Sequence, residues 1–265
     1  MTVFDSDINR VAHLLADAAK SAILPYFRTA NLQTENKIAG GYDPVTLADR
    51  AAEKAMRAVL SDQRPNDAIL GEEYGGQAGT SGLTWVLDPI DGTRGFVAGT
   101  PTWGVLIAVS DGDGPFYGLI DQPYIGERFE GTPKGAYFRG PHGNGVIATR
   151  RARDLSQATL FTTFPQVGSN IERRAFDAVA SQVQLTRYGM DCYAYALLAA
   201  GQIDLVIEAG LQSYDIQAPI ALIHAAGGIV TDWQGGPAHA GGRAIAAANK
   251  AIHAQALAIL KANVT

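Results

Sequence analysis

Apolar side chains recur with helical spacing at the start of the chain. Residues 7–27 place hydrophobic positions three or four apart, and Pro25 marks the end of the pattern. This spacing predicts an amphipathic helix. A second helix is expected to begin after Thr46, which can act as its N-cap with Asp49 at the third helical position, and to end near Leu60.

From residue 68 onward the pattern changes to short apolar runs bounded by glycine, proline and aspartate. The runs predict successive strands at AILG, LTWVLDP, WGVLIAVSD, PFYGLIDQP and RFEGTPKGAYFRG. Beyond residue 158, strands are expected to alternate with helices. The strands are 159–164, 184–189, 203–209 and 229–233, and the helices are 171–181, 191–200, 215–226 and 251–262.

This order predicts an α+β part, about residues 1–145, that passes into an α/β part, about residues 146–265. No stretch rich in proline or serine separates the two parts. We therefore expect one compact unit over residues 1–265.

Composition places the chain among globular proteins and removes several function classes. Of its 265 residues, 47% are hydrophobic and 18% charged, and the net charge is −5. Basic residues cluster only at 150–153 and 173–174, so nucleic acid is not an expected partner. No membrane span and no signal peptide are expected, and a single cysteine, Cys192, suits a reducing compartment. We expect a cytoplasmic protein.

Acidic residues fall where predicted strands end or helices begin. They are Glu72, Glu73, Asp88, Asp91, Asp215 and Asp49. Ligands bind at such strand ends in layered α/β folds. Carboxylates that meet away from water repel one another unless a cation lies between them, and oxygen ligands suit Mg²⁺. The sequence therefore predicts a magnesium site.

The residues after Asp91 suggest the other half of a reaction site. Gly92, Thr93 and Arg94 are expected to begin a short helix whose free N–H groups can bind phosphate. The individual motifs also have structural explanations. Asp-Pro and Asp-Gly are common turn formers, Glu72 and Glu73 can belong to a solvated loop, and Asp215 can be an N-cap. Their joint occurrence favours metal-assisted phosphoryl chemistry.

Four segments together resemble the inositol monophosphatase family: DPVTLAD, GEE, WVLDPIDGT and YDIQAPIALIHAAGG. The resemblance covers almost the whole chain. It implies a layered α-β-α-β-α sandwich, lithium-sensitive and Mg²⁺-dependent phosphomonoesterase activity with two or three ions, and a homodimer.

The same resemblance assigns residue roles. The implied metal ligands are Glu72, Asp88, the carbonyl of Ile90, Asp91 and Asp215. Glu72 would also be catalytic, bridging two ions and holding the one that carries the attacking water. Asp49 would join the outermost ion through water and, with Thr93, orient the water that attacks phosphorus in line, without a phospho-enzyme. Tyr214 stands where the family usually has tryptophan and keeps an aromatic wall.

The substrate depends on residues outside the shared motifs. The flanking segments are most similar to the histidinol phosphatases of this family, which act in histidine biosynthesis. By resemblance, the substrate contacts are Asp91, Gly92, Thr93, Arg94, Arg187, Glu208 and Asp215. Inositol 1-phosphate and adenosine 3′,5′-bisphosphate remain alternatives, as does a non-catalytic protein that binds Mg²⁺ or a phosphometabolite. Arg187 can instead form a surface ion pair, and Asp191 can carry substrate-binding charge or cap a helix.

Overall fold

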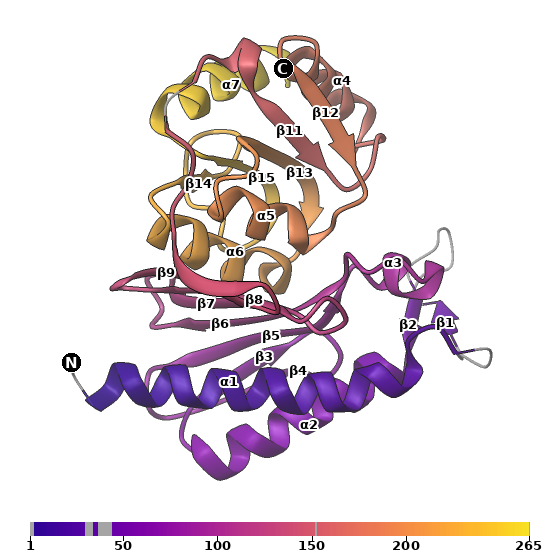
Figure 1. Ribbon diagram of the computed structural model, residues 1–265, viewed down its shortest axis with the longest axis vertical. Helices are drawn as coiled ribbons and strands as arrows, with labels where there is room; N and C mark the ends of the chain where they lie inside the picture. The colour runs from indigo at the N-terminus through magenta and orange to yellow at the C-terminus, as the bar shows by residue number, and fades with distance from the viewer. Residues whose placement is uncertain (1–2, 30–33, 37–43, 152, 265) are drawn as a thin grey trace.

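The computed structural model describes residues 3–29, 34–36, 44–151 and 153–264, and it consists of five alternating layers (Figure 1). The first position of the DPVTLAD motif lies outside the described residues. Helices α1 (Val3–Ile23) and α2 (Leu47–Gln63) form the first layer, and an eight-stranded sheet forms the second. The remaining layers are helices α5 (Cys192–Ala199) and α6 (Ser213–Ala225), a five-stranded sheet, and helices α4 (Asn170–Ala180) and α7 (Lys250–Asn263). This arrangement confirms the predicted α-β-α-β-α sandwich.

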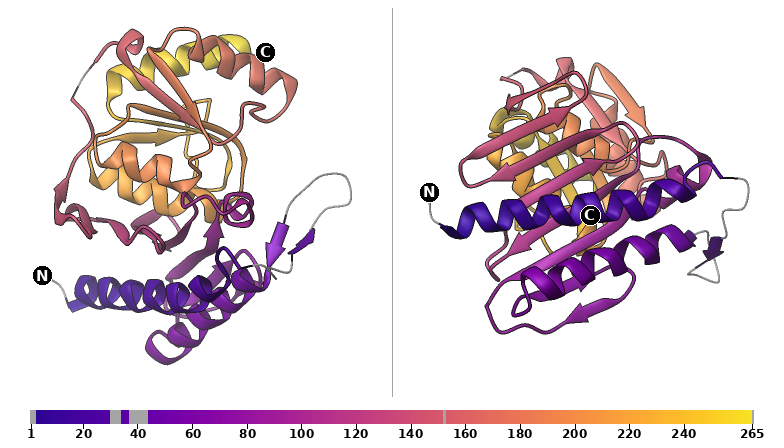
Figure 2. Two further views of the ribbon diagram at one scale, coloured as in Figure 1. Left: turned by 45° about the vertical axis from the view of Figure 1, so that its right-hand side comes forward. Right: turned by 60° about the horizontal axis from the view of Figure 1, so that its bottom comes forward.

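The larger sheet has the order β10-β9-β8-β7-β6-β5-β3-β4, and within it only β3 and β5 are parallel. Its strands are β3 (Ala68–Gly71), β4 (Gly75–Gln77), β5 (Thr84–Asp91), β6 (Gly104–Ser110), β7 (Pro115–Gln122), β8 (Glu127–Thr132), β9 (Gly135–Gly140) and β10 (Gly143–Ile147). Helices α1 and α2 lie side by side across one face of this sheet (Figure 2).

The smaller sheet has the order β12-β11-β13-β15-β14. Its strands are β11 (Thr159–Thr162), β12 (Leu185–Tyr188), β13 (Leu205–Leu211), β14 (Ile229–Thr231) and β15 (Gly242–Ala247). β12, β11 and β13 are parallel, whereas β15 runs antiparallel to both of its neighbours. A separate two-stranded ribbon joins β1 (Thr34–Asn36) to β2 (Pro44–Thr46).

Several boundaries differ from the sequence prediction. The single strand expected over 128–140 is a hairpin, because Pro133 and Lys134 form a turn between β8 and β9. Strands β1, β2, β4, β10 and β15 were not predicted. The first helix ends at Ile23, two residues before Pro25, and continues as a 3-10 turn.

Buried side chains fill the spaces between the layers. Trp85 and Trp103 lie under α1 and α2 in the core and are 0% and 1% exposed, as expected. A second cluster packs α5 and α6 between the two sheets, and a third lies under α4 and α7. Within the described residues, no helix combines the length and apolar character that a membrane span requires.

Candidate active site

A β-bulge near the end of β5 brings Asp88 and Asp91 to the same side of the sheet. Asp88 pairs with Leu106 and Asp91 with Gly104, so β5 has one extra residue between them. In a regular strand, residues three apart point to opposite faces. Pro89 has no N–H to lose from the ladder, and the Asp88 carboxylate accepts a hydrogen bond from the Ile90 N–H at 3.0 Å.

The third carboxylate comes from the other sheet's side of the molecule. Asp215 lies in the first turn of α6, where it accepts a hydrogen bond from the Gln212 N–H at 2.7 Å. Gln212, not Asp215, is the N-cap, because the helix begins two residues earlier than expected. One oxygen each from Asp88, Asp91 and Asp215 lies within 4.8 Å of the others. Asp215 therefore completes the capping box of α6 from its third helical position and also belongs to the acidic cluster.

Burial and mutual repulsion make this cluster costly without a cation. Burial raises the pKa of Asp88 well above its ordinary value, and the negative charges of Glu72 and Asp91 raise it further. For Asp91, burial and the charges of Asp191 and Asp215 have the same effect. The Glu72 carboxylate therefore lies near Asp88, but it is not one of the three carboxylates whose oxygens meet within 4.8 Å. The all-oxygen donor set fits a hard divalent cation.

Asp49 and Thr93 lie beside the cluster. Asp49 accepts hydrogen bonds from the N–H and hydroxyl of Thr46, at 2.8 and 2.6 Å, which confirms the predicted cap of α2. Its second oxygen lies 3.3 Å from the Thr93 hydroxyl, which also lies 3.0 Å from the Ile90 carbonyl. Burial raises the pKa of Asp49 to about 6, so this carboxyl is largely ionised at neutral pH.

The N-terminus of α5 contacts Asp91 across the junction of the two sheets. The Cys192 N–H donates to the Asp91 carboxylate at 2.6 Å, so Asp91 caps α5 from another element. Asp191 occupies the N-cap position of α5, as the capping interpretation expects, but its side chain makes no capping hydrogen bond. Its backbone has φ 47° and ψ −142°, a region that non-glycine residues rarely adopt, and its carboxylate accepts from the Thr102 hydroxyl at 3.2 Å.

Gly92 lets this carboxylate approach the chain closely. A Cβ at Gly92 would lie 2.6 Å from Asp191 Cγ, and the Gly92 φ of 82° is also left-handed. Asp191 therefore lies directly beside the residues expected to bind phosphate. An ionised Asp191 carboxylate would repel a phosphate bound there. This position is therefore better suited to a ligand that also carries a positively charged group.

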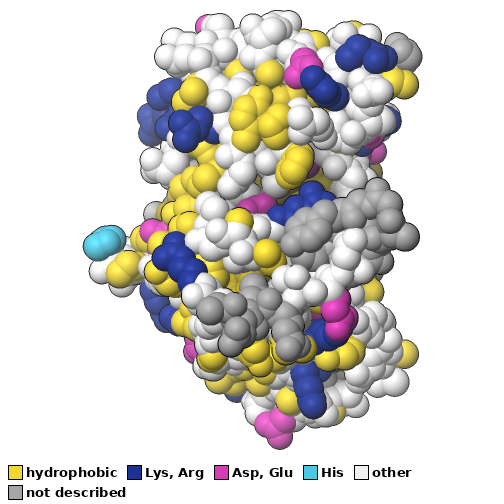
Figure 3. Space-filling model, turned by 90° about the vertical axis from the view of Figure 1, so that its right-hand side faces the viewer, with side chains coloured by type: hydrophobic (Ala, Val, Ile, Leu, Met, Phe, Trp, Pro, Cys, Tyr) yellow, Lys and Arg dark blue, Asp and Glu magenta, His cyan; other side chains and the backbone are white. Residues whose placement is uncertain are grey.

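A pocket of about 290 Å³ adjoins the cluster and contains further charged groups. Its lining includes Arg94, Phe164, Asp191, Tyr195 and Glu208, together with Asp91 and Asp215. Glu208 is 8% exposed and accepts a hydrogen bond from the Thr163 N–H at 2.6 Å, while burial raises its pKa to about 7. On the side shown in Figure 3, acidic and basic side chains lie together at mid-height.

The structure places one expected substrate contact elsewhere. Arg187 is exposed on the edge strand β12, is not among the residues that line this pocket, and has no ion pair with any described residue. Sequence reasoning did not identify Tyr195, Thr163 or Glu53 as part of the site. Glu53 is fully buried in α2 and accepts from the Glu73 N–H at 2.6 Å, so it anchors the loop that carries Glu72. The sequence feature that could have identified Glu53 is an acidic residue on the apolar face of the predicted second helix.

Comparisons with known proteins agree with this geometry. The inositol monophosphatase family model matches residues 5–265. The chain is 43% identical over 237 residues to a bifunctional chloroplast phosphatase of Arabidopsis thaliana, covering 87% of this chain and 66% of that protein. It is 34% identical to a histidinol-phosphatase of Streptomyces coelicolor, covering 95% and 96%.

A solved structure of an inositol monophosphatase from Zymomonas mobilis is also similar. It superposes with a TM-score of 0.85 at 38% identity, covering 98% of this chain and all of that one. The fold, the acidic cluster and the full-length match lead to one conclusion. The chain belongs to the inositol monophosphatase family, whose members are metal-dependent phosphoric monoester hydrolases.

Proposed function

We propose that this protein is a Mg²⁺-dependent phosphatase whose substrate is histidinol phosphate. The observation that carries the phosphatase half is the cluster of Asp88, Asp91 and Asp215, whose oxygens lie within 4.8 Å of one another at the junction of the sheets. Few protein carboxylates and several open positions suit Mg²⁺, which also binds substrate phosphates.

The ions would be held by Glu72, Asp88, Asp91, Asp215 and the Ile90 carbonyl. When bound, they would lower the pKa of a water molecule and neutralise charge on phosphate and on the leaving oxygen. Thr93 has one hydroxyl hydrogen. With that hydrogen directed at Asp49, its lone pairs remain available to orient a water, and ionised Asp49 keeps this arrangement.

The phosphate would lie against Gly92 and Thr93, next to Arg94. The left-handed backbone at Gly92 and the absence of a Cβ allow close approach. These contacts are the ones that the family motif implies.

The substrate half rests on two carboxylates that do not belong to the metal cluster. Asp191 and Glu208 both line the pocket, and the charge of Asp191 contributes to the raised pKa of Glu208, so the two lie near each other. A leaving alcohol with an ammonium group would be attracted between them. Histidinol has such an amine and an imidazole, and two histidinol-phosphatase relatives support the choice.

Inositol 1-phosphate is the second candidate, because the similar Zymomonas mobilis structure is an inositol monophosphatase. Adenosine 3′,5′-bisphosphate is less suited. Its second phosphate would meet the two carboxylates with Arg94 as the only lysine or arginine among the described pocket-lining residues.

A substrate panel tests the proposal. Phosphate release from the three esters is measured with Mg²⁺ and with a chelator, and histidinol phosphate should give the highest kcat/KM. The isosteric variant Asp191→Asn should raise KM for histidinol phosphate about tenfold, equivalent to one charge-assisted contact, and leave KM for inositol 1-phosphate unchanged. Equal effects on both esters, or a preference for inositol 1-phosphate, would contradict the substrate assignment but not the phosphatase.

A further inference from the structure

A second and larger pocket lies away from the acidic cluster. Helix α1 crosses the large sheet, and strands β8, β9 and β10 extend beyond it, as the right panel of Figure 2 shows. The cavity there is about 630 Å³, within the range of small-molecule sites. We call it the outer-strand pocket. Its lining residues come from α1 and from β8 to β10, and it shares none with the pocket beside the cluster.

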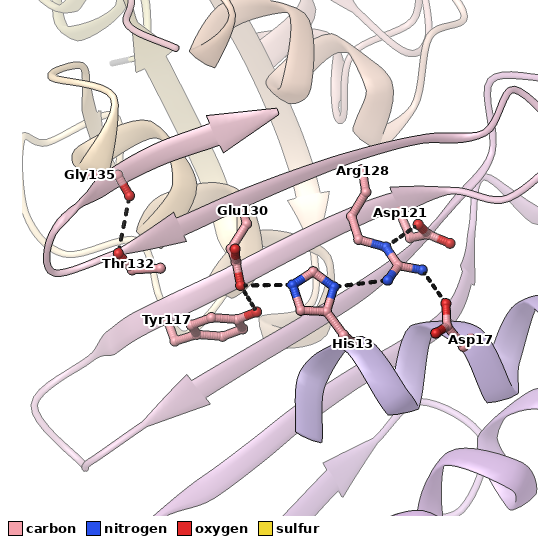
Figure 4. A network of polar contacts seen from close by, with 8 residues as sticks. All are labelled: His13, Asp17, Tyr117, Asp121, Arg128, Glu130, Thr132 and Gly135. Carbon is pink, nitrogen blue, oxygen red and sulfur yellow. Dashed lines mark hydrogen bonds and ion pairs between the residues drawn. The ribbon is translucent and has the colours of Figure 1, made fainter. Parts of the chain in front are cut away.

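A polar network fixes one wall of the outer-strand pocket (Figure 4). Arg128 donates to Asp121 at 2.6 Å, to Asp17 at 2.8 Å and to His13 Nδ1 at 2.9 Å. A guanidinium has only donors, so His13 Nδ1 must accept and its Nε2 must carry the hydrogen. That nitrogen lies 3.3 Å from Glu130.

Within this network the Glu130 carboxylate is bound through one of its two oxygens, Oε1. It accepts from His13 and from the Tyr117 hydroxyl at 2.6 Å. Burial alone would raise the pKa of Glu130, but these two hydrogen bonds together with the charges of His13 and Arg139 lower it. Glu130 is the one carboxylate among the described lining residues, and it stays negatively charged within its network.

The other charges of the lining are positive. Arg128, Lys134 and Arg139 line the pocket, in a chain whose net charge is −5. Arg128 and Arg139 are direct cross-strand partners in the β8–β9 pair. Like charges in such positions are unfavourable. Arg128 forms ion pairs with Asp17 and Asp121, whereas Arg139 acts electrostatically on Glu130 without forming an ion pair with a described residue. An anion beside Arg139 would relieve this repulsion.

The rest of the wall combines aromatic and apolar residues with uncharged polar ones. Tyr137 and Val146 are cross-strand partners on the same face, and they are 37% and 78% exposed. The side chains of Asn9 and Asn144 also line the cavity. An aromatic surface next to cations suits a ligand that has both a planar ring and negative charge.

We propose that the outer-strand pocket is a second, non-catalytic binding site for a small aromatic dianion. Lys134 and Arg139 bind the anionic group, and Tyr137 packs against the ring. The network around Arg128 holds β8 and α1 in place as the rigid back wall. The proposal is independent of the substrate of the catalytic site.

Phenylphosphonate is a suitable probe, because its C–P bond cannot be cleaved as a phosphate ester. Calorimetric titration of the full-length, metal-free protein should detect binding, and the double variant Lys134→Gln/Arg139→Gln should weaken it at least about tenfold. The matched change Arg94→Gln, in the other pocket, should leave this affinity unchanged. The double variant should also keep the wild-type rate of phosphate ester hydrolysis.

Either of two results would overturn the proposal: wild-type affinity in the double variant, or no binding by the wild type up to about 10 mM probe. If the double variant keeps its affinity but changes its oligomeric state, this face contacts a second copy of the chain instead of a ligand. Light scattering on the same samples separates these cases.

Discussion

Ionisation of the buried Asp88 carboxyl is unfavourable in the metal-free protein. Asp88 is 2% exposed, and burial and the charges of Glu72 and Asp91 raise its pKa. In the unfolded chain the carboxyl group loses its proton near pH 4, whereas the folded, metal-free protein keeps that proton to a higher pH. The free energy of unfolding of the metal-free protein therefore falls as pH rises from about 4 through the raised pKa of Asp88. A bound cation restores this free energy.

Asp88→Asn should accordingly stabilise the metal-free protein at pH 8, because it removes one buried charge from the cluster. A gain of about 1–2 kcal/mol corresponds to a rise in melting temperature of roughly 2–8 °C for a domain of this size. Mg²⁺ should stabilise the wild type and no longer stabilise the variant. Thermal unfolding with and without Mg²⁺ measures both effects.

The exposed Asp113 provides the control for this experiment. Asp113→Asn should change neither the metal-free melting temperature nor the response to Mg²⁺. A metal-free Asp88→Asn protein less stable than the wild type at pH 8 would show that the cluster is not strained by charge.

Backbone strain at Asp191 gives a second prediction at this scale. Glycine adopts φ 47° and ψ −142° more readily than aspartate. Asp191→Gly should raise the free energy of unfolding by about 1 kcal/mol, whereas Asp191→Asn, which keeps the side-chain size, should gain less. Urea titrations of both variants decide whether the backbone is strained. Equal stability of Asp191→Gly and Asp191→Asn would argue against it.

The sequence predicts the carboxylates of the acidic cluster but not the conformation of Asp191. Asp88, Asp91 and Asp215 stand in recognisable segments, and the structure brings them together. The position of Asp191 was not predictable from the sequence, because its neighbours in the site, such as Asp91, which accepts from the adjacent Cys192 N–H, come from another element.

At the scale of elements, capping residues and helix or strand propensity predicted helices and strands correctly where they agreed with tertiary packing. Thr46 and Asp49 form the expected capping box of α2. Strand β15 was missed because its sequence, GRAIAA, is rich in alanine, a helix former. Ala244 and Ala246 face one core cluster and Ile245 and Ala247 another, so burial on both faces overrides propensity. The bulge in β5 was likewise invisible without its partner strand.

Helix α2 also holds the loop that carries the proposed metal ligand Glu72, through Glu53. This side chain pairs with Arg57 at 2.8 Å and accepts from the N–H groups of Glu73 and Tyr74, which follow Glu72. Glu53→Gln should lower the free energy of unfolding by about 1–3 kcal/mol, because a buried charged hydrogen-bond network is weakened. It should also weaken Mg²⁺ binding measured by calorimetry.

The same change in an exposed ion pair is the matched control. Glu35→Gln, which affects only the pair with Arg50, should leave both the melting temperature and Mg²⁺ affinity unaltered. Unchanged Mg²⁺ affinity in Glu53→Gln would mean that the Glu72 loop is held by other contacts.

At the scale of the whole molecule, the site lies at the junction of two sheets. The large sheet supplies Asp88 and Asp91, α6 supplies Asp215, and α5 donates the Cys192 N–H to Asp91. The division near residue 145 and the homodimer remain predictions. Hydrophobic patterns predicted the order of the helices and strands, and the family resemblance predicted the layers. The distances between the carboxylates at the junction follow only from the packing of both sheets against α5 and α6.

Release of inorganic phosphate from histidinol phosphate, measured as Mg²⁺ is titrated into wild type and Asp91→Asn, tests the central claim most directly. Wild type should show no turnover with a chelator and saturable turnover with Mg²⁺. Asp91→Asn, folded by circular dichroism, should lose activity by at least about a hundredfold at saturating Mg²⁺. Full Mg²⁺-dependent turnover in Asp91→Asn would contradict the account.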